Sequence, residues 1–129
     1  TIKVIQSVHA EGYKKKDKVC VISFQGRKAT ILQRPSVSFS VGLENLKQLK
    51  ATSYTPLASA IKKTLTLINQ EQIKGISIPV IVIISDLGAN ISLKKPALNA
   101  STSDDFNYIA NELVALARKI GKKHYIVLI

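Results

Sequence analysis

The stretch "PVIVIISDLGAN", residues 79–90, decides the fold that this sequence predicts. Apolar residues 80–84 run without a polar break into Ser85, Asp86 and then Gly88. A strand that is apolar on both faces is typical of the centre of a parallel sheet that helices cover on each side. We therefore predict a fully buried central strand over 78–85, with Asp86 at its carboxyl end.

Two apolar runs near the N-terminus predict a β-hairpin. The runs are "VCVISF" (19–24) and "ATILQ" (29–33), and only the short turn "QGRK" separates them. A turn of this length allows only antiparallel pairing of the two strands. Residues 34–41, "RPSVSFSV", are expected to form a loop.

Helical patterns lie before, between and after these strands. Apolar residues at mostly helical spacing predict a first helix from Ile2 to about Tyr13, a short one over 42–50, and one from about Asp104 that ends at Gly121. Thr55 and Pro56 are typical of the N-cap and first position of a further helix. With a last strand over 124–129, the expected fold is α/β, one domain over 1–129, with a mostly parallel sheet and an antiparallel edge strand.

Composition limits the class of protein and of partner. The chain has 129 residues, 46% of them hydrophobic, and 19 basic against 8 acidic residues give a net charge of +11. This charge favours anionic partners, such as nucleic acid, phosphate-rich ligands or an acidic protein face. The single cysteine, Cys20, excludes a disulfide framework or a zinc cluster, and no run approaches the roughly 18 apolar residues of a membrane helix. A soluble, cytoplasmic protein is expected.

Thr55 and Asp86 are the candidate metal ligands. Ligands of open α/β sheets bind beyond the carboxyl ends of the strands, where Asp86 is expected, and a helix that starts at Thr55 would face the same edge. Mg²⁺ prefers oxygen ligands, so a carboxylate and a hydroxyl would form a partial magnesium site. Each residue also has a structural interpretation, as a helix N-cap and as a turn former. The sequence shows no catalytic triad, Cys/His pair or P-loop, so catalysis by this chain alone is not expected.

Four motifs carry a resemblance to a known family. They are the hairpin "DKVCVISFQGRKATILQRP" (17–35), the helix start "TPLASAI" (55–61), the strand end "SDLGAN" (85–90) and the helix "IANELVALARKI" (109–120). Together they resemble the von Willebrand factor A domain of the magnesium chelatase D subunit, over essentially the whole chain. The resemblance implies a three-layer, Rossmann-like α/β fold.

The resemblance also implies a metal-ion-dependent adhesion site. Such a site takes an Asp-x-Ser-x-Ser motif after the first strand, a Thr from a second loop and an Asp from a third. Thr55 and Asp86 match the second and third positions, whereas Leu87 displaces the usual glycine to Gly88 and the first motif is absent. The first strand would then be missing, with the domain truncated at its N-terminus and at its C-terminus. Either the natural protein contains this segment, which we favour, or another chain supplies it.

The missing strand would lie between the hairpin strand 19–24 and the strand 78–85. Both strands would be left as apolar edges, which are prone to aggregation or strand exchange.

The function implied by the resemblance is that of a non-catalytic interaction domain in an ATP-dependent magnesium chelatase. Its partners would be an ATPase subunit related to the AAA+ family and a large catalytic subunit that inserts Mg²⁺ into protoporphyrin, on the route to chlorophyll. Alternatives are a cobaltochelatase-type module of cobalamin synthesis, another von Willebrand A module that binds proteins, or a basic nucleic-acid-binding domain. An enzyme that uses Asp86 as a nucleophile would need further acidic residues at neighbouring strand ends.

Overall fold

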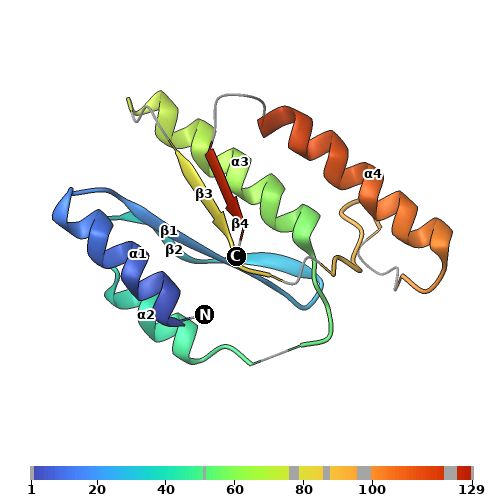
Figure 1. Ribbon diagram of the computed structural model, residues 1–129, viewed down its shortest axis with the longest axis horizontal. Helices are drawn as coiled ribbons and strands as arrows, with labels where there is room; N and C mark the ends of the chain where they lie inside the picture. The colour runs from blue at the N-terminus through green and yellow to red at the C-terminus, as the bar shows by residue number, and fades with distance from the viewer. Residues whose placement is uncertain are drawn as a thin grey trace. The chain divides into compact units, whose positions relative to one another are not determined.

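The computed structural model describes residues 2–50, 52–75, 79–85, 88–95, 100–120 and 125–128. These residues confirm the predicted α/β class and the predicted order of elements. Contacts divide the chain into two compact units, Thr1–Ser23 with Thr30–Ala51, and Phe24–Ala29 with Thr52–Ile129. The elements, shown in Figure 1, are α1 (Ile2–Lys14), β1 (Val19–Gln25), β2 (Lys28–Ser36), α2 (Ser40–Lys47), α3 (Leu57–Ile73), β3 (Val80–Ile83), α4 (Ser103–Ile120) and β4 (Tyr125–Leu128).

The described strands form two sheets of two strands each, β1 with β2 and β3 with β4. The β3–β4 pair is parallel, with Val80 opposite Tyr125 and Ile83 opposite Leu128. The prediction of one mostly parallel sheet with the hairpin at its edge therefore does not describe these residues. The three-layer arrangement stays a prediction.

The prediction that β3 is fully buried is wrong for this chain. Val80 is 59% exposed, and Ile81, Val82 and Ile83 are only half-buried. Within the described residues β3 has one neighbouring strand, β4, so one of its edges carries no strand. The apolar sequence of β3 is suited to a more enclosed position than the one it occupies here.

The hairpin agrees with the prediction and is longer than expected. Gly26 lies in the two-residue turn with a φ of +68°, the left-handed region that glycine adopts without strain. Strand β2 continues to Ser36, so part of the predicted loop over 34–41 is strand. Pro35, which has no N–H to donate, is tolerated there because a strand of a two-stranded sheet has an open edge.

The core of the first unit joins both strands of the hairpin to two helices. Val21, Phe39 and Leu46 are buried together, and Ile5, Val19, Leu32 and Leu43 pack against them. The ring of His9 stacks on Phe39 with 4.8 Å between centroids, and its Nε2 lies 3.1 Å from the carbonyl oxygen of Val37. Helix α1 contributes only part of its apolar surface, since none of its residues is buried and Tyr13 is 61% exposed.

Gly42 lies where two other residues approach the backbone of α2. A Cβ atom at this position would lie 2.8 Å from Cε2 of Phe39 and 2.9 Å from Cβ of Gln33. The Gly42 N–H also donates a hydrogen bond to Oε1 of Gln33, at 2.9 Å. Only glycine fits here without displacement of the core.

In the second unit, helix α3 packs against helix α4 (Figure 1). The buried apolar residues of the two helices are Leu57, Ala58, Ala60, Leu67, Ile68, Ile109, Leu116 and Ile120. Phe106, near the start of α4, is 48% exposed, whereas the polar Glu112 occupies a buried position. No helix within the described ranges is both long enough and apolar enough to cross a membrane.

A capping box begins α4. The hydroxyl of Thr102 accepts a hydrogen bond from the N–H of Asp105 at 3.2 Å, and Oδ2 of Asp105 accepts from the N–H groups of Ser101 and Thr102, each at 3.1 Å. The backbone hydrogen bond from Ser101 is the main cause of a pKa for the Asp105 carboxyl below its ordinary value of 3.8, and the bond from Thr102 adds to it.

Gly42→Ala is expected to destabilise the protein by about 1–3 kcal/mol, because the added methyl group overpacks the Phe39 and Gln33 contact. Urea denaturation followed by circular dichroism measures this change. Gly12→Ala in α1 is the matched control, since a Cβ there meets its neighbours at ordinary distances of 3.5 and 3.6 Å. The control should stabilise the helix by up to about 1 kcal/mol. Equal effects at both positions would contradict the close approach at Gly42.

Asp105→Asn is expected to remove a pH-dependent contribution to stability. The pKa of Asp105 is lower in the folded state than its ordinary value of 3.8, so the carboxylate stabilises the fold above that pH. This contribution disappears as the pH falls through the folded pKa. The wild-type urea midpoint should exceed that of the variant at neutral pH, and the difference should shrink in acid below pH 3.8. A difference that stays constant throughout this range would be inconsistent with the capping box.

Candidate functional site

The side chain of Asn90 joins two segments that are far apart in the sequence. Its Oδ1 accepts a hydrogen bond from the N–H of Thr55 at 2.8 Å, across a separation of 35 residues. Its Nδ2 donates to the carbonyl oxygen of Ser53 at 2.9 Å. The backbone N–H of Asn90 donates to the carbonyl oxygen of Thr55 at 3.4 Å. We call these three hydrogen bonds the Asn90 clamp. The clamp holds the segment before α3 against the segment that follows the predicted metal ligand Asp86.

Thr55 does not cap α3 as the sequence predicted. The helix begins at Leu57, and Pro56 occupies the N-cap position with φ −81° and ψ 62° and with no side-chain cap hydrogen bond. The carbonyl oxygen of Thr55 accepts hydrogen bonds from the N–H groups of Leu57, at 3.0 Å, and of Asn90. Thr55 thus lies outside the helix, where the clamp binds its backbone. Its side chain is half-buried and is not used for capping.

Asp86 and Leu87 lie outside the described residues, so the structure does not place the second predicted ligand. The described residues contain no group of three or more His, Cys, Asp or Glu side chains that could hold a metal ion. Magnesium binding by Thr55 and Asp86 therefore stays a prediction. The structure places Thr55 beside Asn90. Asn90 follows Asp86 by four residues in the sequence.

A buried carboxylate holds the loop that follows Asn90. Glu112, on α4, accepts hydrogen bonds from the Ser92 hydroxyl at 2.9 Å and from the N–H groups of Leu93 and Lys94 at 2.8 and 3.0 Å. The N–H of Lys95 donates to the hydroxyl of Ser92 at 2.9 Å. Ser92 is 1% exposed and Glu112 is 8% exposed, and these charge-assisted bonds offset the cost of burying the carboxylate.

Sequence reasoning missed Glu112. The available signal was its spacing, because Glu112 lies three residues after Ile109 and four before Leu116, on the apolar face of α4. A carboxylate at such a position requires donors from another element, and the sequence does not say which element supplies them.

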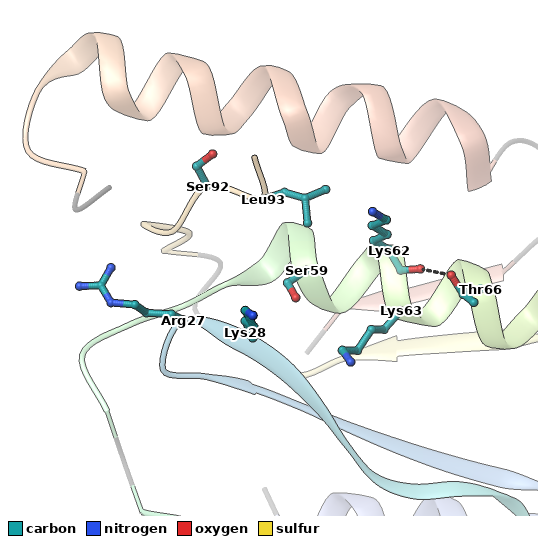
Figure 2. A pocket seen from close by; sticks show the side chains of 8 residues that line it. All are labelled: Arg27, Lys28, Ser59, Lys62, Lys63, Thr66, Ser92 and Leu93. Carbon is teal, nitrogen blue, oxygen red and sulfur yellow. Dashed lines mark hydrogen bonds between the residues drawn. The ribbon is translucent and has the colours of Figure 1, made fainter. Parts of the chain in front are cut away.

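Four of the eight residues that line a pocket of about 300 Å³ are basic, and the sequence reasoning missed this pocket too (Figure 2). We call it the basic pocket. Ser59, Lys62, Lys63 and Thr66 recur at helical spacing and form its α3 wall. The turn of the hairpin and the loop held by Glu112 complete the lining, with Arg27, Lys28, Ser92 and Leu93.

Three contacts hold the hairpin turn at the basic pocket. The N–H of Ala29 donates a hydrogen bond to the Ser59 hydroxyl at 3.0 Å, and Ala29 is 3% exposed. The N–H of Gly26 donates to the Thr52 hydroxyl at 2.9 Å. The guanidinium of Arg27 lies over the ring of Tyr54, 4.7 Å from its centroid. The basic side chains of the turn are thus carried by a fixed backbone.

Comparison with known proteins finds similarity to magnesium-chelatase subunits. The chain is 32% identical to the magnesium-chelatase 67 kDa subunit of Chlorobaculum parvum over 116 residues, which are 90% of this chain and 19% of that protein. It is 26% identical to the magnesium-chelatase 60 kDa subunit of Rhodobacter capsulatus over 111 residues, 86% of this chain and 20% of that protein. The chain thus spans about a fifth of the length of these subunits.

A third relative is an uncharacterized protein of Methanocaldococcus jannaschii. It is 32% identical over 92 residues, which cover 70% of this chain and 53% of the relative. No family model matches the chain, and no solved structure matches it. The chain is therefore similar to a region of magnesium-chelatase subunits, and this similarity extends over most of its length.

Asn90→Ala is expected to lower the free energy of unfolding by about 1–3 kcal/mol, because two side-chain hydrogen bonds are lost and the Thr55 N–H loses its acceptor. Urea denaturation gives the energy, and amide hydrogen exchange at Thr55 reports the clamp directly. Asn107→Ala on the exposed face of α4 is the control, with little change expected in either measurement. Unchanged exchange at Thr55 in Asn90→Ala would refute the role of the clamp.

Proposed function

We propose that this chain is a von Willebrand A-type interaction module of a magnesium-chelatase subunit and that it performs no chemistry itself. The observation that carries the proposal is the similarity to magnesium-chelatase subunits over 90% of the chain in one relative and 86% in another. The α/β class and the order of elements are compatible with such a module.

The proposed role is to assemble the chelatase. Its partners would be an ATPase subunit related to the AAA+ family and a large catalytic subunit that inserts Mg²⁺ into protoporphyrin. The protein would act in the cytoplasm. A cobaltochelatase-type module would use the same assembly surface, and the identity of the partner that binds distinguishes the two.

We propose further that Mg²⁺ makes this assembly metal-dependent. The Thr55 hydroxyl and the Asp86 carboxylate are hard oxygen donors of the kind that Mg²⁺ takes, and waters fill most of its remaining positions. An acidic residue of the partner would complete the site. The Asn90 clamp supports this proposal, because it holds the backbone of Thr55 beside the segment that follows Asp86.

Thr55→Ala and Asp86→Ala are expected to weaken association with a chelatase partner subunit in Mg²⁺ by at least about tenfold, or about 1.4 kcal/mol. Each removes one oxygen ligand, and neither should shift the melting temperature by more than a few degrees. Surface plasmon resonance with the full chain, in Mg²⁺ and then in EDTA, measures the effect.

Asp104→Ala is the charge-matched control, because Asp104 is exposed in the first turn of α4. It should bind the partner as the wild type does. Normal Mg²⁺-dependent binding by both Thr55→Ala and Asp86→Ala would rule out the metal site, and absence of any association by the wild type would rule out the assembly role.

A further inference from the structure

We propose that α4 is a dimerisation surface, which pairs in antiparallel orientation with α4 of a second copy of this chain. This inference is independent of the proposed metal-dependent assembly. Helix α4 buries one face within the second unit. A second apolar stripe runs along the helix beside that face, and we call it the outer stripe. It consists of Phe106, Ala110, Leu113, Val114 and Ala117.

The outer stripe is open to solvent. Phe106 is 48% exposed and Val114 is 49% exposed. Ala110 and Ala117 are also exposed, and Leu113 is half-buried. A surface helix of a monomer typically has one apolar face and a polar face opposite. Contiguous exposed apolar residues, unlike single scattered ones, are typical of an interaction surface.

The spacing of the outer stripe favours another helix as its partner. Phe106, Ala110, Leu113 and Ala117 follow one another at intervals of four, three and four residues. Alternating intervals of three and four are the heptad spacing with which two helices pack side by side. The small side chains of Ala110 and Ala117 allow the axis of a second helix to approach closely.

The outer stripe is complementary to itself in the antiparallel orientation. Around a two-fold axis every contact occurs twice, so that residue i faces residue j and j faces i. Superposing the centres of two antiparallel stripes sets Phe106 opposite Ala117 and Ala110 opposite Leu113. Each large side chain then meets a small one, which is the arrangement that fills an interface evenly. A parallel pair would instead set Phe106 against Phe106 and Ala117 against Ala117.

The charges at the two ends of α4 select the same orientation. Its first turn is acidic, with Asp104 and Asp105, and its last turn is basic, with Arg118 and Lys119. The antiparallel register brings the acidic turn of each copy to the basic turn of the other, and the helix dipoles attract in this orientation too. A parallel pair would place like charges together. Exposed ion pairs stabilise only modestly, so they set the orientation more than the affinity.

The dimer is expected to be weak. One helix of 18 residues provides less contact area than a standard protein interface. Two copies that each carry a net charge of +11 also repel one another. Physiological salt screens this repulsion beyond about 8 Å, so the contact at the outer stripe decides association. We expect a dissociation constant on the order of 10–100 µM.

Sedimentation velocity of the full chain at physiological salt, over a concentration series that spans the expected constant, tests the dimer. Ala117→Glu should raise the dissociation constant by about tenfold or more, because it places a carboxylate opposite Phe106 of the second copy. Ala115→Glu is the matched control. Ala115 is also an exposed alanine of α4, and it lies about 200° around the helix from Ala117. The control should change the constant by less than about threefold.

Cross-linking through introduced cysteines tests the orientation, in a Cys20→Ala background and with a short bismaleimide. In the antiparallel register the two copies of residue 110 are displaced by three residues along the axis, or about 4.5 Å. The two copies of residue 117 are displaced by eleven residues, or about 16 Å. Ala110→Cys should therefore cross-link to itself, and Ala117→Cys should not.

Three results would overturn the proposal. A wild-type chain that stays monomeric throughout the concentration series would mean that the outer stripe belongs to a different partner. Equal weakening by Ala115→Glu and Ala117→Glu would mean that added charge, and not the outer stripe, controls association. Equal cross-linking at positions 110 and 117 would mean that the helices pair in parallel. Circular dichroism establishes that each variant is folded.

Discussion

The hydrogen bonds of the Asn90 side chain are the constraint on which the candidate site depends. One amide group accepts from the N–H of Thr55 at 2.8 Å and donates to the carbonyl oxygen of Ser53 at 2.9 Å. Both backbone groups lie before α3, where no helix or sheet supplies them with a partner. By pairing the part-buried N–H of Thr55 and the exposed carbonyl oxygen of Ser53, Asn90 fixes the path of this segment as well as its position. The proposed magnesium site requires this juxtaposition.

The Glu112 carboxylate extends the same arrangement toward the basic pocket. It binds the Ser92 hydroxyl and two backbone N–H groups, and Ser92 and Leu93 form one wall of the pocket. A buried carboxylate thus organises the loop that forms this wall.

The unpaired strand edges give the fold its second feature of functional interest. Within the described residues, β1 pairs only with β2, and β3 pairs only with β4. Val80 of β3 is 59% exposed although its sequence context is apolar. Exposed apolar strand edges invite further pairing.

The sequence by itself determined the local elements. The spacing of apolar residues marked the helices, and the "QGRK" turn marked the hairpin, because these signals are carried by neighbours in the chain. Only the tertiary structure decided the partial exposure of β3, the engagement of Thr55 by Asn90, the burial of Glu112 and the convergence of Arg27 with Lys62. Each of these depends on contacts between residues about 20 or more apart in sequence, or on which strands are present to pair. Local propensity contains no information on such contacts, since chain packing alone brings the partners together.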